Sequence, residues 1–576
     1  MSTPKEIFLE LIKPDGQPER QLCQYEALHM CLTDPINTYL RGNRKRGSVS
    51  KDRWGTTISF PEDAPGPIPV HTPELSVCTD VTCWKETIHV PDLSVCSEGW
   101  EECRTRSRAA ADAEGKLLAG FMGTGIFEQC HFLMGFEDTL TALYEHPDEM
   151  HELIETITQY RLDYVRRLID GLQPDVIFSH DDWGTKNALF MKPDMWREFF
   201  KEPYRRFYGY IRSRGVIAIH HADSYLVPIV DDMAEIGIQV WQGTLPENDI
   251  PALQRHLSGK LTLMGGFGAA IDRADAQPDE ILAYARDALA RYCPGGHFIP
   301  SITYGLAGTV FPHVDQYLDQ AVNEYNAGLH IPVTPLPAVP KRKISEAKAE
   351  TVQAVTSAQE SADVFENIAR ALERGQQKKL LTLCQQALDE GHEPGDILSE
   401  GMIVGMNRLG EAFSANRAFV PEMLMAARCM SAATELLKPL MVGEGTEPVG
   451  RVCLGTVKGD MHDIGKNLVR IMMEGSGIEV FDLGVDTSAE QFVSTAVENH
   501  CGVIACSSLL TTTMEEMREV VKLVHERGLQ DQIKVMVGGA PISQSFCDEI
   551  GADYYAEDAG AAAREAVKIL KVQKAS

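Results

Sequence analysis

The chain has 576 residues, of which 44% are apolar, and carries a formal net charge of −29. This length and composition predict three or four globular domains, and the negative charge disfavours nucleic acid and anionic membranes as partners. The fourteen cysteines follow no disulfide rhythm, the N-terminus shows no signal-peptide core, and no run approaches 18 apolar residues. We therefore expect a cytoplasmic protein with reduced thiols and no membrane span.

Residues 1–330 alternate strand-like and helical patterns. Helical patterns such as Pro147–Leu172 lie between short apolar runs. Alternation of this kind over about 300 residues predicts an α/β fold, a (β/α)8 TIM-type barrel of eight units. The strand-like runs are Leu117–Phe121, Val176–Ser179, Val216–His220, Ile238–Trp241, Leu261–Gly265 and His297–Ile302.

Polar residues follow two of these runs, where barrels usually carry their chemistry. His180, Asp181 and Asp182 follow one run, and a histidine-rich segment follows the next. His180 and Asp181 could instead cap the following helix, since aspartate is a good cap. The candidate catalytic residues are Asp181, Asp182, His220, His221 and Asp223.

The middle of the chain changes character twice. Four prolines and a Lys-Arg-Lys run indicate an interdomain linker at residues 331–360. Residues 361–445 then carry four apolar stripes at helical spacing, which predict a four-helix bundle. Methionines in these stripes are by themselves ordinary core residues.

Residues 446–576 again alternate strands and helices. Five short apolar strands separated by helical patterns predict a doubly wound parallel sheet, Rossmann-like or flavodoxin-like. The strands are expected at Arg451–Val457, Ile478–Leu483, Gly502–Ser507, Lys534–Gly538 and Ala552–Tyr555.

A strand–loop–helix motif opens this last domain. Its loop reads Gly-Asp-Met-His-Asp-Ile-Gly over residues 459–465. Asp460 precedes His462 by two residues, so the carboxylate can hold one ring nitrogen while the other faces a metal. A Ser-Ser-Leu segment at residues 507–509 and a Gly-Gly pair at residues 538–539 follow.

This three-part pattern resembles the cobalamin-binding module of methionine synthase and of the small corrinoid proteins of methyl transfer. The resemblance implies that His462 is the lower cobalt ligand and that Asp460 and Thr513 belong to its proton relay. The helical bundle would be the family's cap over the upper cobalt face. The implied cofactor-binding residues are Gly459, Asp460, Met461, His462, Asp463, Gly465, Ser507, Leu509, Thr511, Thr513, Gly538 and Gly539, with Phe413 and Val420 from the cap.

The first 330 residues resemble the uroporphyrinogen decarboxylase family, and within it the methyltransferases. The marks are residues 52–55, 181–184, 193–197 and the His220 segment. Many corrinoid-linked members bind zinc through His-x-Cys and a later Cys near the last strand, but Ala222 replaces the first cysteine and no cysteine follows residues 301–305 in the barrel half. A candidate zinc site of His220, His221 and Asp223 remains, provided that the strand ends before them, because adjacent strand residues point to opposite faces.

The two resemblances together imply a corrinoid-dependent methyltransferase, or demethylase. It would move a methyl group from a small methylated substrate to Co(I) of a cobalamin bound on the same chain. Two alternatives stay open: a methyl-corrinoid to thiol or folate methyltransferase, and a non-enzymatic cobalamin-binding carrier or sensor. A second methyltransferase and a corrinoid reductive activase are candidate partners.

Overall fold

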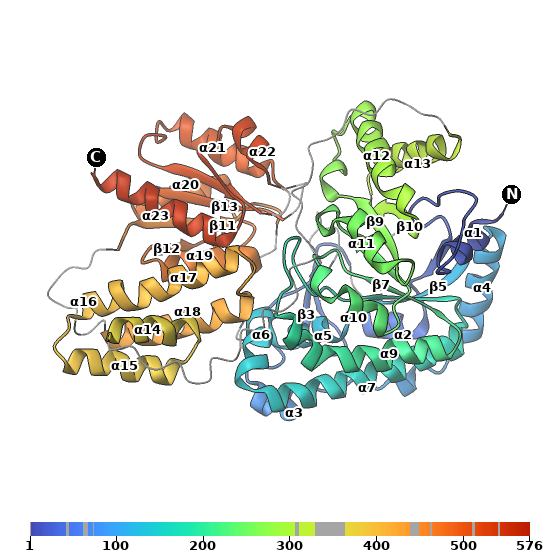
Figure 1. Cartoon of the computed structure of the whole chain (residues 1–576), viewed down its shortest axis with the longest axis horizontal. Helices are drawn as coiled ribbons and strands as arrows, with labels where there is room; N and C mark the ends of the chain where they lie inside the picture. Colours follow the sequence, from blue (N-terminus) through green and yellow to red (C-terminus); the bar gives the residue numbers. More distant parts are fainter. Residues whose placement is uncertain are drawn as a thin grey trace. The chain divides into compact units, whose positions relative to one another are not determined.

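The computed structural model describes residues 2–41, 45–60, 67–72, 74–305, 310–328, 363–437, 440, 448–460, 464–509, 513–539 and 542–575. The chain forms two compact units, Met1–Glu350 and Thr351–Ser576 (Figure 1). The expected linker, residues 331–360, includes the division and lies outside the described residues. Within the described residues, no helix is both long and apolar enough to cross a membrane.

The first unit is built on a curled parallel sheet, and the predicted barrel-type fold is confirmed. Its strands follow the chain in the order β1-β5-β6-β7-β8-β9-β10. In the described part of the chain this sheet has seven strands, whereas eight units were expected. The segment before β1 lies against β10, because Gln24 N–H donates to Pro300 O at 2.8 Å. The strands are β1 (Leu28–Cys31), β5 (Leu117–Met122), β6 (Val176–His180), β7 (Ile217–His221), β8 (Val240–Thr244), β9 (Thr262–Phe267) and β10 (Phe298–Ile302).

Helices connect these strands and cover the sheet (Figure 1). The longest, α7 (Pro147–Leu172), starts with proline at its first position, where no N–H is needed, and buries a stripe at helical spacing. The other main helices are α4 (Trp100–Ala113), α5 (Ile126–Met134), α6 (Phe136–Glu145), α9 (Glu202–Ser213), α10 (Val230–Glu235), α11 (Ile250–Leu257), α12 (Pro278–Tyr292) and α13 (Pro312–Asn326). Short elements complete the unit: α1 (Pro4–Leu11), α2 (Pro35–Arg41), α3 (Trp84–Thr87), α8 (Pro193–Trp196) and the antiparallel strands β2 (Ser48–Lys51), β3 (Thr57–Phe60) and β4 (Ile68–Pro69).

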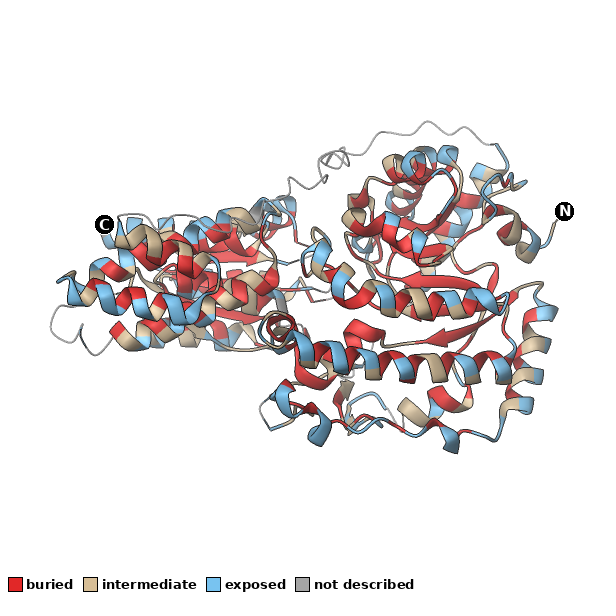
Figure 2. Cartoon of the chain, turned by 60° about the horizontal axis from the view of Figure 1, so that its bottom comes forward, coloured by how far each residue is buried: buried red, intermediate tan, exposed pale blue. Residues whose placement is uncertain are grey.

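Alternate residues of the barrel strands fill its interior. Val176 and Phe178 of β6, Ile217 and Ile219 of β7, and Val240 of β8 belong to one buried apolar cluster. Because side chains alternate along a strand, the residue two positions further on each strand also points inward. Figure 2 shows how burial concentrates on the strands and the inner helix faces.

The second unit contains a five-stranded parallel sheet in the order β12-β11-β13-β14-β15. This is the flavodoxin-like order, and it confirms the predicted doubly wound domain. Its strands are β11 (Arg451–Thr456), β12 (Glu479–Asp482), β13 (Val503–Ser507), β14 (Lys534–Gly538) and β15 (Tyr554–Ala556). Its helices are α19 (Ile464–Gly475), α20 (Ala489–Glu498), α21 (Glu516–Glu526), α22 (Gln544–Ile550) and α23 (Ala559–Ala575).

The predicted helical bundle belongs to the same compact unit as this sheet. Glycines let α17 approach α19 closely, since a Cβ on Gly410 would meet Met472 and one on Gly475 would meet Met406, each at 2.6 Å. The bundle consists of α14 (Val364–Glu373), α15 (Gln377–Asp389), α16 (Pro394–Asp396), which runs on through a π-helical turn into α17 (Ile403–Ser414), and α18 (Val420–Leu437).

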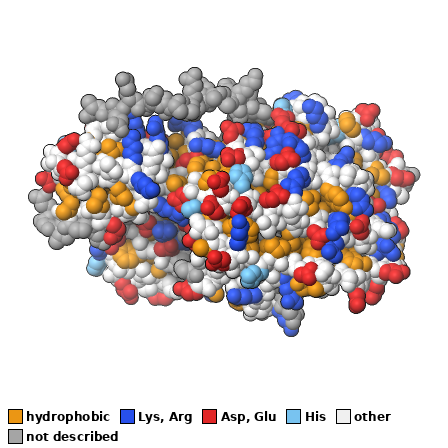
Figure 3. Space-filling model, turned by 90° about the horizontal axis from the view of Figure 1, so that it is seen from below, with side chains coloured by type: hydrophobic (Ala, Val, Ile, Leu, Met, Phe, Trp, Pro, Cys, Tyr) orange, Lys and Arg blue, Asp and Glu red, His pale blue; other side chains and the backbone are white. Residues whose placement is uncertain are grey.

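Acidic and basic side chains are mixed on the face drawn in Figure 3, where Lys and Arg side chains are interspersed with Asp and Glu. On this face the acidic side chains are spread out, as expected of charges that serve solubility.

Candidate functional site

The loop after β11 holds a buried carboxylate. Asp460 has no exposed surface, and its Oδ2 accepts hydrogen bonds from Leu509 N at 2.7 Å, Thr513 Oγ1 at 3.0 Å and Ser508 Oγ at 3.3 Å. Thr513 thus lies where the relay hydroxyl was expected. Ser508 was not among the expected residues. Its neighbour Ser507 ends β13, so the next side chain is the one that turns toward Asp460.

Small residues meet at the carboxyl ends of the neighbouring strands. Ser507 pairs with Gly538, and Gly538 pairs with Ala556. Gly539 has φ +129°, and a Cβ there would lie 1.8 Å from Ser508 O. No side chain fits at this position, so bare backbone lines the sheet end where such folds bind ligands. The residues present therefore fit the tail of a cobalamin.

Some of the remaining expected cofactor residues are described by the structure, and the others lie outside the described residues. Val420 is buried at the start of α18, Phe413 is partly buried in α17, and Leu509 leaves 46% of its surface exposed. Gly459 has φ +79° in the loop, and Gly465 is exposed in the first turn of α19. Met461, His462, Asp463 and Thr511 lie outside the described residues, so the cobalt ligand stays a prediction.

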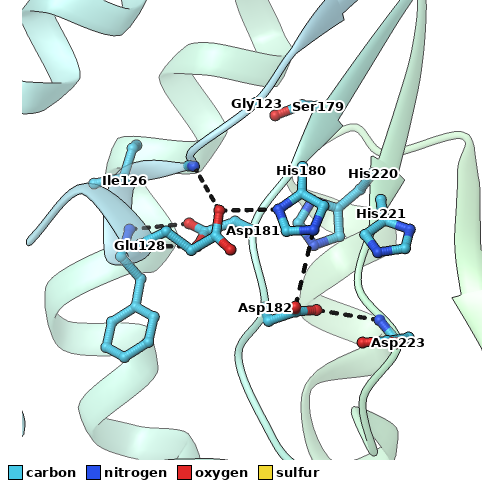
Figure 4. Close-up of polar contacts among 12 residues, drawn as sticks. Gly123, Ile126, Glu128, Ser179, His180, Asp181, Asp182, His220, His221 and Asp223 are labelled. Atoms are coloured by element: carbon cyan, nitrogen blue, oxygen red, sulfur yellow. Dashed lines mark hydrogen bonds and ion pairs between the residues drawn. The ribbon is translucent and has the colours of Figure 1, made fainter. Parts of the chain in front are cut away.

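The carboxyl ends of β6, β7 and β8 carry a second polar cluster, inside the barrel. His180, His221 and Gln242 each stand two residues after an inward apolar residue of their strand. His180 and His221 are register partners, and their rings stack with centroids 4.5 Å apart and an interplanar angle of 17°. Figure 4 shows His180 between two carboxylates, Glu128 and Asp182.

His180 and Glu128 form an ion pair, with Nδ1 2.9 Å from Oε2. Burial alone would lower the pKa of His180, but Glu128 and Asp182 raise it to about 10. Burial would likewise raise the pKa of Glu128, but the charge of His180 and its hydrogen bond lower it to about 2. At neutral pH, His180 is therefore a cation and Glu128 an anion.

Asp181 and Asp182 are adjacent in the chain but make different contacts. Asp181 is fully buried, and its carboxylate accepts from Phe127 N and Glu128 N, both at 2.9 Å, so it caps α5 rather than the helix that follows it. Asp182 is partly exposed, with Oδ2 3.9 Å from His180 Nε2 and Oδ1 accepting from Asp223 N at 3.1 Å. Burial raises the pKa of Asp182 to about 6. Burial and Asp182 also raise the pKa of Asp223.

His220 does not join this cluster. Strand β7 runs through His221, so His220 points to the outer face, where its ring stacks on Trp183 with centroids 4.0 Å apart. A hydrogen bond of 2.7 Å joins its Nδ1 to the hydroxyl of Tyr208. The structure therefore does not bring together the expected group of His220, His221 and Asp223. It brings His180, Asp182 and His221 together instead, with ligand atoms within 4.8 Å of one another.

Comparison with known proteins finds a matching family model in each half of the chain. A uroporphyrinogen decarboxylase (URO-D) model matches residues 53–325, and two B12 binding domain models match residues 364–438 and 450–568. Dimethylamine corrinoid protein 2 of Methanosarcina mazei is 43% identical over 179 residues, 31% of this chain and 84% of that protein. A corrinoid protein of Desulfitobacterium hafniense is 39% identical over 210 residues, which cover 36% of this chain and 97% of that protein.

A solved methanol:cobalamin methyltransferase complex of Methanosarcina barkeri aligns with 25% identity and a TM-score of 0.34, over 45% of this chain and 96% of that one. The domain matches and the corrinoid relatives confirm the predicted cobalamin cofactor. The chain belongs to the corrinoid-protein family, and the match to the uroporphyrinogen decarboxylase (URO-D) model precedes its two B12 binding domain matches.

Proposed function

We propose that this chain is a corrinoid-dependent methyltransferase that moves a methyl group from a small methylated substrate to Co(I) of a cobalamin held on the same chain. The observation that carries the proposal is the charged His180–Glu128 pair beside Asp182 at the barrel strand ends, in a chain that also carries B12 binding domains. The proposed boundaries are 1–330 for the barrel, 331–360 for the linker, 361–445 for the cap and 446–576 for the sheet domain.

In the sheet domain, cobalamin supplies a strong cobalt nucleophile when it is bound and reduced. His462 would hold the cobalt when cobalamin is bound, with Asp460 as its carboxylate partner. The hydroxyls of Ser508 and Thr513 lie within hydrogen-bond distance of Asp460 Oδ2 and can share a proton with it. Removing either hydroxyl would weaken this proton sharing with Asp460 without removing a cobalt ligand.

In the barrel, the polar cluster would act on the heteroatom that loses its methyl group. That oxygen, nitrogen or halide gains electron density as the methyl group leaves, so a fixed positive charge beside it stabilises the transition state. His180 carries such a charge at neutral pH, and Glu128 keeps it there. Asp182 and Asp223, with raised pKa values, can hold a proton nearby.

Fusion of the two modules supports transfer within one chain. Tethering two sites raises their effective concentration to roughly millimolar for a short flexible link. A second methyltransferase that receives the methyl group, and a reductive activase that returns oxidised cobalt to Co(I), are the proposed partners.

The test is the absorbance of the reduced, corrinoid-loaded chain while methyl ethers, methylamines, betaines and methyl halides are added in turn. We expect one donor class to remove the Co(I) band. The Glu128→Gln variant should slow this loss at least tenfold while retaining its corrinoid. Persistence of the band with every donor, together with demethylation of the methylated corrinoid by a thiol or folate, would support the acceptor-side reaction instead.

A further inference from the structure

We propose that His180, Asp182 and His221 form a binding site for one divalent transition-metal ion of the zinc type. Each residue offers one ligand atom, and the three atoms lie within 4.8 Å of one another. Two imidazoles and a carboxylate are a ligand set that zinc accepts, and three protein ligands leave a fourth position open. The candidate arrangement lies at the carboxyl ends of β6 and β7 (Figure 4).

One nitrogen of each histidine ring is already occupied by a neighbouring side chain. His180 Nδ1 is bound by Glu128 Oε2, and His221 Nδ1 is bound by Gln242 Oε1. The Gln242 amide nitrogen donates to Ile302 O at 3.2 Å, which turns the amide oxygen toward His221. Metal-binding histidines characteristically donate one ring N–H to a carboxylate or carbonyl, leaving the other nitrogen for the metal. Both rings show this pattern.

The carboxylate of Asp182 is held at one oxygen and turns the other toward His180. Asp182 Oδ1 is held by Asp223 N and Ser224 Oγ, while Oδ2 faces His180 Nε2 at 3.9 Å. That separation is too long for a hydrogen bond. Two atoms bound to one tetrahedral zinc ion stand about 3.3 Å apart, given ligand distances of about 2.0 Å. A small movement of either side chain therefore admits an ion between them.

The groups that support these ligands are themselves held in place by hydrogen bonds within the protein. Glu128 lies in the first turn of α5, where its Oε2 also accepts from Gly125 N at 3.1 Å. Asp181 caps the same turn with two hydrogen bonds. Rigid supporting shells of this kind give metal sites their affinity.

Charge favours the same conclusion. Glu128 and Asp182 both lie beside His180, so a divalent cation bound there would be near two carboxylates. The open position would take the heteroatom of the methylated substrate; this last role rests on the proposed function, whereas metal binding does not.

The test is a titration of the full, corrinoid-free chain with Zn²⁺ alone, in competition with a chromophoric chelator. We expect one ion per chain. Replacement of each ligand, in His180→Gln, Asp182→Asn and His221→Gln, should weaken binding at least 100-fold. Loss of a supporting group, in Glu128→Gln and Gln242→Leu, should weaken it about 10- to 100-fold. Circular dichroism melting checks that every variant is folded.

Two controls separate this site from adventitious binding. His256 forms an exposed pair with Asp231 on the surface, so His256→Gln should leave Zn²⁺ affinity unchanged. His220 is the immediate neighbour of His221 but faces outward, so His220→Gln, if folded, should also retain the ion. Absence of stoichiometric Zn²⁺ binding, or binding that survives His180→Gln and His221→Gln, would overturn the proposal. Methyl transfer by a chain that binds no Zn²⁺ would overturn the metal site while leaving the proposed function intact.

Discussion

The contact between Gly539 and Ser508 allows a sharp test of the cofactor-binding sheet end. In Gly539→Ala the new Cβ would lie 1.8 Å from Ser508 O, at a φ of +129°. That backbone conformation costs alanine about 1–3 kcal/mol. The overlap can be relieved only if the backbone of Ser508 or of residue 539 moves by about 1 Å or more, because Ser508 O is a backbone atom.

A shift of Ser508 also disturbs the next residue. Leu509 N donates to the buried carboxylate of Asp460 at 2.7 Å, and losing a hydrogen bond to a charged group costs about 1.5–3 kcal/mol. We therefore expect Gly539→Ala to destabilise the second unit by about 3–5 kcal/mol and to reduce corrinoid retention. Gly551→Ala is the matched control: its φ is +75° with no atom within 4 Å, so it should cost only about 1 kcal/mol.

Urea unfolding of the corrinoid-free chain measures both effects. All six tryptophans lie before residue 242, so their fluorescence follows the first unit, whereas circular dichroism follows both. Corrinoid retention is measured as bound cobalt after gel filtration. Equal destabilisation by Gly539→Ala and Gly551→Ala, with equal corrinoid content, would refute the close approach of Gly539 to Ser508.

Three further predictions concern stability. Asp34 is fully buried and caps α2 through Ile36 N and Asn37 N, and burial raises its pKa to about 6. Between about pH 4 and pH 6 the unfolded chain binds fewer protons than the folded one, so the free energy of unfolding falls as pH rises. Asp34→Asn should therefore gain about 2.5 kcal/mol on the wild type between pH 4 and pH 7.5, and a flat difference would contradict this. The side chain of Lys466 is 2% exposed and pairs with Asp482 at 2.5 Å, so Lys466→Met should lower the free energy of unfolding by about 3 kcal/mol. Lys522→Met, in an exposed pair with Glu519, should lower it by under about 0.5 kcal/mol. Equal urea midpoints for the two variants would argue against the buried pair. Asp181→Ala removes the acceptor of two buried N–H groups and should cost about 2–3 kcal/mol by tryptophan fluorescence, whereas Asp181→Asn keeps one acceptor and should cost less.

Much of the fold follows from apolar runs in the sequence. Six of the seven described barrel strands, and all five strands of the second unit, fall where such runs predict them. Strand β1 was missed because Leu28–Cys31 is only four residues long and includes His29. The sequence pattern also does not show where the sheet closes: eight units were predicted, and the described residues form seven strands of this sheet.

The site was predicted less completely, for two physical reasons. Adjacent residues on a strand face opposite sides, and the sequence does not show where β7 ends, so His220 could not be separated from His221. Alternation with Phe178 and Ile219 does point to His180 and His221 as the inward pair, and this signal could have been used. Glu128 comes from α5, 52 positions before His180, and no local motif links the two.

The central claim is that one chain takes a methyl group from its substrate and gives it to its own cobalamin. The most direct measurement is the rate at which the Co(I) band disappears after rapid mixing with saturating donor, at several chain concentrations. The account predicts a first-order rate constant that does not change on dilution and that falls in Asp182→Asn with corrinoid content unchanged. An observed rate constant that rises in proportion to chain concentration, or a Co(I) band that survives every donor, would contradict it.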